Sequence, residues 1–422
     1  MNPSQRDDQR IALLQAALRE HNLDALLVSL PSHVLLLTGY YPVVGVSIAI
    51  CTRDGEIALL APEDEKQFAE QRWATDVEYF QPVTLEEIPP LAQSVIPPLK
   101  RLAQKMQFAS ARIGIESGPV SEPSSYSALN CYGSALQAIS KEVWPGAELV
   151  NAHKVLHHLC AVKTPSELRK IRTACSIAAS AFEGGRKTIA PAASEIELAA
   201  GFAREFATAA ASAGIDRQHA FLYCMSGPNS AHAYYAYAHS TDRKLGRRDW
   251  VLVHCNSQVG GYWTDITRTY VMGEHTERHQ EMFRAVLEAR DAALAVIRPG
   301  AKASAVDAAA REVIEKHGFK GGFKHQTGHG VGFGAIDAHA LPRIHPKSGD
   351  VLENGMVFNV EPAIYREGFG GVRQCEMVAV TDTGAEILTP FHSQFADLQI
   401  SARVSERNIQ PRRKPSRLKK AS

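Results

Sequence analysis

Apolar and polar positions alternate along the first third of the chain in patterns typical of mixed helices and strands. Apolar residues recur at helical spacing over 9–20, and the apolar run 22–30 that follows is typical of a buried strand. Two apolar strands over 47–62 meet at Asp54-Gly55, which predicts a hairpin. The stretch 89–98 is rich in proline and is interpreted as a break. We therefore expect an α/β domain here.

The pattern changes after about residue 160. Two capping boxes, Thr164 with Glu167 and Ser194 with Glu197, predict the starts of two helices. Hydrophobic periodicity and turn residues predict the elements that follow. These are strands at 220–225, 250–255 and 262–272, a long helix that stops at Arg298-Pro299-Gly300, a helix over about 303–317, and strands with Gly-rich loops over 325–390.

Composition narrows the class of protein. The chain has 422 residues, of which 45% are hydrophobic and 22% charged, as in globular proteins with sizeable cores. The formal net charge of +1 gives no global field for nucleic acid or membranes, so neither is expected as a partner. We expect no signal peptide, because the N-terminus is polar. The seven cysteines are scattered, which predicts a reducing, cytoplasmic location. All but Cys375 are expected to be small buried apolar side chains.

Four apolar stretches contain isolated polar residues. They are 251–256, 262–270, 325–346 and 356–380, and the residues that stand out are Asp265, His329, Glu361 and Cys375. A buried carboxylate or imidazole is costly unless it is paired or bound to metal. Each residue alone is compatible with a satisfied hydrogen bond in the core. Together they indicate a site assembled from several strands.

The order of motifs resembles the pita-bread hydrolase family, which includes methionine aminopeptidase, aminopeptidase P, prolidase and creatinase. The matching stretches are YWTDITRT, HGVG, PRIHP, LENGMVFNVEP, and GGVR followed by VTDTGAE. LDALLVS, LLTGY and the Asp54-Gly55 hairpin resemble the creatinase-type N-terminal domain. The resemblance implies an α/β N-terminal domain over 1–155 and an α+β pita-bread catalytic domain over 156–395, in a homodimer. The basic segment 396–422 is expected to be a disordered, solvated tail.

The resemblance also implies a set of metal ligands. Metal-dependent members hold two divalent ions with Asp, Asp, His, Glu and Glu, and three of these correspond to Asp265, His329 and Glu361. The first Asp position carries His254 and the last Glu position carries Cys375. Softer nitrogen and sulfur donors shift the preference from manganese toward zinc. A single zinc, two ions, or no metal as in creatinase remain open.

Glu376, beside Cys375, is expected to face away from the site, because side chains alternate across a strand.

Further residues receive catalytic roles through the resemblance. Glu361 is expected to shuttle a proton, and His339 with His232 to stabilise a developing oxyanion; His239 is the alternative to His232. His325 also matches a histidine of the family. Arg373 either orients a carboxylate in the site or forms a structural salt bridge.

The expected function is hydrolysis of Xaa-Pro peptide bonds by metal-activated water. One alternative is a metal-independent or mononuclear creatinase-like hydrolase of a small amide or other C–N substrate. The other is a catalytically degenerate protein that uses the closed pocket for binding.

Overall fold

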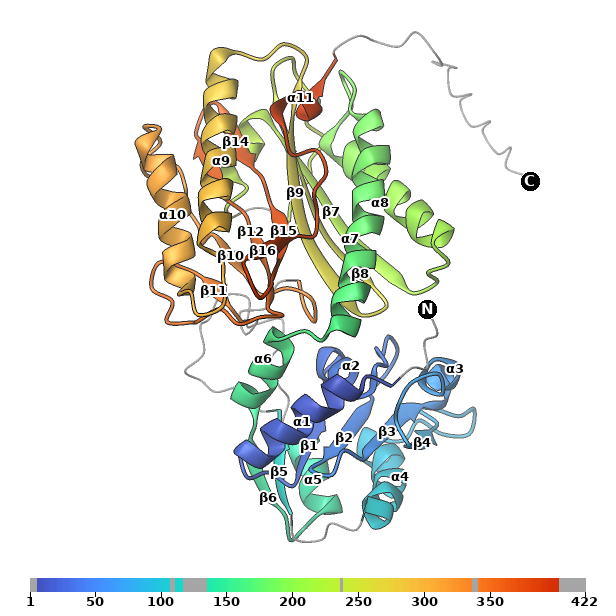
Figure 1. Ribbon diagram of the computed structural model, residues 1–422. Helices are drawn as coiled ribbons and strands as arrows, with labels where there is room; N and C mark the ends of the chain where they lie inside the picture. The colour runs from blue at the N-terminus through green and yellow to red at the C-terminus, as the bar shows by residue number, and fades with distance from the viewer. Residues whose placement is uncertain (1–5, 107–110, 117–134, 236–237, 336–340, 402–422) are drawn as a thin grey trace, which may run out of the picture.

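The computed structural model describes residues 6–106, 111–116, 135–235, 238–335 and 341–401. The chain forms two parts that lie end to end, with the N-terminal part below and the C-terminal part above in Figure 1. No helix within the described ranges is long and apolar enough to cross a membrane. Residues 402–422 of the expected tail lie outside the described residues. The expectation of disorder is wrong for 396–400, which belong to a short helix (Phe395–Leu398) and a strand (Gln399–Ile400).

The N-terminal part is built on a six-stranded mixed sheet with strand order β4-β3-β2-β1-β5-β6. The expected hairpin is confirmed, and Gly55 adopts a φ of 85° in its turn. Helices pack on both faces of the sheet and bury two apolar clusters. The elements are α1 (Asp8–Glu20), β1 (Ala25–Val28), α2 (Pro31–Thr38), β2 (Ile48–Thr52), β3 (Ile57–Pro62), η1 (Glu63–Glu65), α3 (Lys66–Ala69), β4 (Asp76–Phe80), α4 (Leu91–Met106), β5 (Arg112–Ile115), α5 (Ala135–Val143), β6 (Glu148–Asn151) and α6 (His153–Ala161).

The expected Pro-rich break at 89–98 is wrong for residues 91–98, because helix α4 begins at Leu91 and runs on with Pro97 and Pro98 inside. Proline lacks the backbone N–H that would close an i to i−4 hydrogen bond, which usually ends a helix. Here Leu99 and Leu102 are fully buried against the sheet. This tertiary packing outweighs the local cost of the prolines.

The C-terminal part is a set of small curved sheets with helices on either side (Figure 1). The main sheet has the order β17-β9-β8-β7, and β12-β15-β16, β13-β14 and β10-β11 complete the layer. Both expected capping boxes are present, at the starts of α7 and α8. The elements are α7 (Pro165–Gly185), η3 (Arg186–Thr188), α8 (Glu195–Ser212), β7 (Gln218–Ser226), η4 (Gly227–His232), β8 (Trp250–Val259), β9 (Tyr262–Met272), α9 (Glu277–Val296), α10 (Ala303–Lys316), β10 (Gly328–His329), β11 (Arg343–Ile344), β12 (Val357–Val360), β13 (Ala363–Arg366), β14 (Gly370–Arg373), β15 (Glu376–Val380), β16 (Ala385–Ile387), α11 (Phe395–Leu398) and β17 (Gln399–Ile400).

The β8–β9 hairpin turns through Gly260 and Gly261, which have φ values of 56° and 93°. Positive φ at both central residues is the geometry of a two-residue hairpin turn that matches strand twist. A Cβ atom on Gly261 would come within 2.7 Å of Tyr41 and 2.8 Å of Leu35. The tip of the hairpin is therefore pressed against the N-terminal part.

A buried ion pair joins the two parts of the chain. Arg10 of α1 donates from Nε to Glu167 of α7 over 2.8 Å, and from Nη1 to the carbonyl of Leu159 over 2.8 Å. Glu167 also belongs to the capping box of α7. The start of this helix is thus tied to the first helix of the chain.

Candidate active site

The register of the β8–β9 hairpin brings four polar side chains to one face of the main sheet. His254 pairs with Thr267 and Asn256 pairs with Asp265. Residues two apart on a strand share a face, and so do directly paired residues of neighbouring antiparallel strands. All four side chains are buried. The strand pair alone thus places His254 beside Asp265, at 3.8 Å between Nδ1 and Oδ1.

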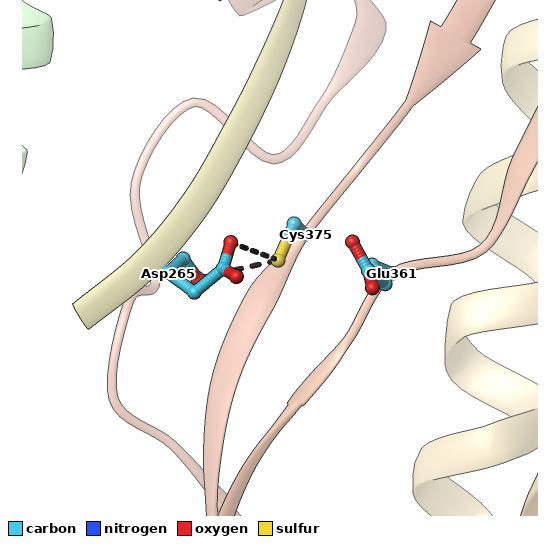
Figure 2. A group of neighbouring side chains, drawn as sticks. All are labelled: Asp265, Glu361 and Cys375. Carbon is cyan, nitrogen blue, oxygen red and sulfur yellow. Dashed lines mark hydrogen bonds between the residues drawn. The ribbon is translucent and has the colours of Figure 1, made fainter. Parts of the chain in front are cut away.

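Cys375 and Glu361 enter this face from the C-terminal segments (Figure 2). The backbone N–H of Cys375 donates to the carbonyl of Thr267 over 3.1 Å, which docks the segment onto β9. The thiol of Cys375 donates to the Asp265 carbonyl over 3.2 Å and lies 3.8 Å from its Oδ1. Ligand atoms of Asp265, Glu361 and Cys375 all lie within 4.8 Å of one another.

His329 completes the group from the short strand β10. Its Nε2 lies 3.5 Å from Oδ2 of Asp265, and its Nδ1–H donates to the carbonyl of Gly330 over 3.1 Å. The preceding Gly328 is required because any Cβ there would collide with the Asn359 carbonyl. The backbone N–H of His329 donates to Oδ1 of the same asparagine over 2.7 Å. These contacts aim Nε2 at Asp265.

Arg373 occupies the centre of the site beside His254. Its Nη2 donates to Nδ1 of His254 over 3.0 Å, its Nε donates to Oγ1 of Thr267 over 3.1 Å, and its Nη1 lies 3.4 Å from the Tyr365 hydroxyl. Because a guanidinium only donates, Nδ1 of His254 is an acceptor. The Nε2–H of His254 then donates to Oδ1 of Asn256 over 2.9 Å. Both ring nitrogens are therefore committed to hydrogen bonds within the protein.

The two histidines of the cluster, His254 and His329, have pKa values shifted in opposite directions. Burial is the main cause that lowers the pKa of His254 to about 4, with Asp265 opposing and Arg373 adding to it. Burial also lowers the pKa of His329, but the hydrogen bond and charge of Asp265 raise it to about 9. Asp265 itself has a pKa lowered to about 2, because both rings outweigh burial. His254 is therefore a neutral hydrogen-bonding group, whereas His329 responds directly to Asp265.

The other two acidic groups of the cluster, Glu361 and Cys375, have pKa values raised above their ordinary values, which favours their neutral forms. Burial, followed by the charge of Asp265, raises the pKa of Glu361 to about 7, with Arg373 opposing. Burial is also the largest cause that raises the pKa of the Cys375 thiol well above its ordinary value, and Asp265 and Glu361 add to it. A cation at this point would stabilise both ionised groups.

The donor set fits one divalent ion. Ligand atoms around a tetrahedral zinc lie roughly 3–4 Å apart, given bonds of about 2.0–2.3 Å. The spacing among Asp265, Glu361 and Cys375 requires only a small contraction, and His329 adjoins Asp265. His254 does not fit as a ligand, because Arg373 occupies Nδ1 and Asn256 occupies Nε2.

The other four histidines that were expected in or near the site do not belong to the cluster among the described residues. His325 donates from Nδ1 to the Gln326 carbonyl over 2.7 Å and accepts at Nε2 from Tyr365 over 2.9 Å, so it reaches the cluster only through that hydroxyl. His232 is half-buried and its Nδ1 lies 3.0 Å from the Tyr235 hydroxyl. His239 is exposed, and His339 lies outside the described residues.

Three site residues escape sequence reasoning: Asn256, Thr267 and Tyr365. Asn256 and Thr267 each lie two positions from a predicted site residue on the same strand. Side chains alternate between the faces of a strand, so this spacing could have predicted that both face the site. The Nδ2 of Asn256 is buried without a hydrogen-bond partner among the described residues.

Glu376 faces away from the site as expected and accepts a hydrogen bond from Nη2 of Arg268 over 2.7 Å.

Comparisons with known proteins agree with this architecture. The model of the Creatinase/Prolidase N-terminal domain matches residues 10–159, and that of Metallopeptidase family M24 matches residues 169–382. An Xaa-Pro dipeptidase of Pyrococcus furiosus is 29% identical over 90% of this chain and 97% of its own length.

Solved structures show the same fold. The prolidase of Pyrococcus furiosus is 27% identical, with a TM-score of 0.69 over 89% of this chain and 98% of that one. An X-Pro aminopeptidase of Thermotoga maritima, at 23% identity, shares the fold with a TM-score of 0.74 over 90% of this chain and 99% of its own. The expected two-part, pita-bread architecture is confirmed. The chain belongs to metallopeptidase family M24 and carries the creatinase/prolidase type of N-terminal domain.

Proposed function

We propose that this chain hydrolyses Xaa-Pro peptides with one divalent ion held by Asp265, His329, Glu361 and Cys375. The substrate class is supported by relatives that match nearly the whole chain and are named Xaa-Pro dipeptidase and prolidase. The single observation that carries the one-ion site is the convergence of Asp265, Glu361 and Cys375 within 4.8 Å. The hydrogen bond from Arg373 to Nδ1 of His254 supports leaving His254 out of the proposed ligand set.

Zinc suits this set better than manganese, because a thiolate and an imidazole are softer donors than carboxylates. When bound, such an ion supplies a Lewis acid and an activated water at neutral pH. The Cys375 thiol proton leaves when the sulfur becomes a ligand. The affinity for the ion therefore increases as the pH rises.

The side chains of the cluster divide the remaining work. Glu361 is the group that moves a proton between water and the leaving nitrogen, because its carboxylate faces the cluster. Nε of Arg373 lies 3.9 Å from Oε2 of Glu361 and supplies a positive charge beside it. The partnerless Nδ2 of Asn256 supplies a buried donor for the carbonyl oxygen of the substrate.

The segment that carries His232 packs against the strand that carries Arg373. Helix η4 packs on β14, where the backbone N–H of Gly371 donates to Oγ of Ser230 over 2.8 Å. His232 ends this helix and is the candidate that contacts the substrate. His339 keeps its expected role in oxyanion stabilisation as a prediction from the sequence.

The test combines elemental analysis of the purified protein with hydrolysis of Xaa-Pro dipeptides and tripeptides, using Xaa-Ala peptides as controls. We expect one ion per chain, hydrolysis that is lost on chelation, and recovery with zinc. E361Q should lower kcat by about 10²–10⁴-fold. The matched control E353Q, at an exposed carboxylate, should leave kcat unchanged.

Two outcomes would replace the proposal. A second candidate is acid–base hydrolysis of a small C–N substrate, for which His254 and Arg373 form a hydrogen-bonded pair of buried polar groups. Folded protein that lacks ions and hydrolyses small amides in the presence of chelator would establish that reaction. Peptide binding without turnover under every metal condition would instead show a degenerate pocket.

We also propose that the protein works in the cytoplasm as a homodimer. The free cysteines of the described chain support a reducing compartment. Light scattering during size-exclusion chromatography measures the mass directly. A single species at the mass of one chain would contradict the dimer.

A further inference from the structure

A second cluster of reactive side chains lies at the junction of the two parts of the chain. A small cavity of about 20 Å³ is lined on the N-terminal side by His33, His157 and Cys160. Phe333 and Gly334 of the catalytic part line the opposite side, together with Lys163. None of these residues belongs to the candidate active site.

Cys160 departs from the expectation that every cysteine except Cys375 is a buried apolar side chain. Among the cysteines that the structure describes, it alone is not buried. Cys51, Cys175, Cys224 and Cys255 are buried as expected, and Cys131 lies outside the described residues. Cys160 sits at the end of α6, where its sulfur faces the cavity.

His33 and Glu116 form a fixed pair beside this thiol. Nδ1 of His33 lies 2.6 Å from Oε1 of Glu116, and both residues are buried. The carboxylate also accepts from the backbone N–H groups of Ser29 and Leu30, each over 3.0 Å, so its position is set by the backbone. A nucleophile, a base and a carboxylate that orients the base is the arrangement that activates cysteines in enzymes.

The charges around the cavity are mainly positive. Burial lowers the pKa of His33, but the neighbouring Cys160 thiol and Glu116 raise it to about 10, so the ring carries a proton at neutral pH. Lys163 is buried at the cavity wall and donates to the Ala161 carbonyl over 3.0 Å. Arg10 lies close enough to interact with the sulfur, although Glu167 pairs with it. Cysteines in electropositive, partly open surroundings are the ones that react as thiolates.

We propose that Cys160 is a peroxide-reactive thiol that works with His33, whose ring Glu116 orients. In the reaction the sulfur attacks one oxygen of hydrogen peroxide, an S–O bond forms and the O–O bond breaks. The sulfur loses two electrons and becomes a sulfenic acid. The departing hydroxide takes a proton from His33 and leaves as water, and the thiol proton replaces it on the His33 ring. Net, one thiol and one peroxide give one sulfenic acid and one water.

The size of the cavity selects the oxidant. The cavity volume of about 20 Å³ accommodates one or two non-hydrogen atoms. A single water molecule needs roughly 10–15 Å³ on the same scale. Hydrogen peroxide meets this limit, whereas a disulfide such as oxidised glutathione has a bulky group on each sulfur. The site is therefore expected to discriminate against disulfide exchange.

The experiment treats the full chain with hydrogen peroxide in the presence of dimedone, which traps sulfenic acids, and locates the adduct by peptide mass spectrometry. We expect one adduct, on Cys160, that C160S abolishes. Its rate should exceed by about tenfold or more the rate of the same cysteine in a synthetic peptide of residues 155–165. Oxidised glutathione should modify it no faster than it modifies the peptide.

Variants identify the base. H33N and E116Q should each slow trapping by about tenfold or more. The control H158N changes an exposed histidine on α6, the helix that carries Cys160, and should leave the trapping rate unchanged. Circular dichroism checks that each variant is folded. Trapping in the wild-type protein at the rate of the free peptide would overturn the proposal without any variant. Equal rates in wild type and a folded H33N would remove His33 from it.

Discussion

Arg373 donates a hydrogen bond to His254 across 3.0 Å, in the place where metal-dependent relatives have an aspartate as ligand. A guanidinium carries the positive charge that a second ion would otherwise supply to this side of the cluster. Asp265 lies beside both residues, and its low pKa reflects their proximity. The exchange at residue 254 is thus accommodated by hydrogen bonding within the protein.

The double variant H254D, C375E should take up two ions per chain, against one in the wild type. Restored carboxylates supply the two missing ligands, and Arg373 then pairs with Asp rather than with an imidazole. Elemental analysis after dialysis against manganese measures the stoichiometry. H254N is the control and should remain at one ion. A folded double variant that still holds one ion would contradict this account of residue 254.

C375S should weaken zinc binding by at least about tenfold, because a hydroxyl is a much poorer ligand than a thiolate. Competition with a chromophoric chelator measures the affinity. Cobalt-loaded wild type should also show a sulfur-to-metal absorption band that C375S lacks. C224S, at another buried cysteine, should leave both unchanged. An unchanged band in C375S would place the sulfur outside the metal site.

E376Q should lower the free energy of unfolding by about 3–5 kcal/mol and leave the ion content unchanged. The carboxylate of Glu376 is buried and accepts from Arg268 and from the Thr389 hydroxyl, each over 2.7 Å. Urea denaturation gives the stability. The control E386Q affects an exposed pair with Arg172 and should cost less than about 1 kcal/mol. Loss of ions in E376Q would mean that this residue reaches the site.

The stabilisation that His33 contributes should fall as the pH rises from 6.5. Its pKa is about 10 in the folded chain and about 6.5 when unfolded, so its contribution is complete below pH 6.5 and is lost toward pH 10. Burial lowers the pKa of Lys163 to about 8, so this neighbour acts in the opposite direction only above pH 8. Between pH 6.5 and 8 the difference in unfolding free energy between wild type and H33Q should shrink by roughly 1–2 kcal/mol. A constant difference across this window would contradict the pairing with Glu116 and Cys160.

Much of the candidate site could be anticipated from the sequence. The motifs located Asp265, His329, Glu361 and Cys375. The structure brings ligand atoms of Asp265, Glu361 and Cys375 within 4.8 Å of one another and places Nε2 of His329 3.5 Å from Asp265. Strand alternation correctly separated Cys375 from Glu376. These inferences succeeded because spacing along a strand fixes which face a side chain occupies.

Other features depend on contacts that no local pattern encodes. The hydrogen bond between His254 and Arg373 joins residues more than a hundred positions apart, so the sequence around His254 does not predict it. Pro97 and Pro98 read as a break because the apolar surface that holds α4 is supplied by other segments. Cys160 was indistinguishable from its buried counterparts, because its neighbours His33 and Glu116 come from distant strands and helices.

Gly261 packs closely against Tyr41 and Leu35 of the N-terminal part. The position of the β8–β9 hairpin therefore depends on residues that are not themselves metal ligands. None of the proposed ligands comes from the described residues of the N-terminal part, yet this part packs against the end of the hairpin that carries Asp265. Substitutions in α2 or in the segment after it can therefore tilt this strand by small amounts. Substrate preference could drift by that route during evolution while every metal-binding side chain stays the same.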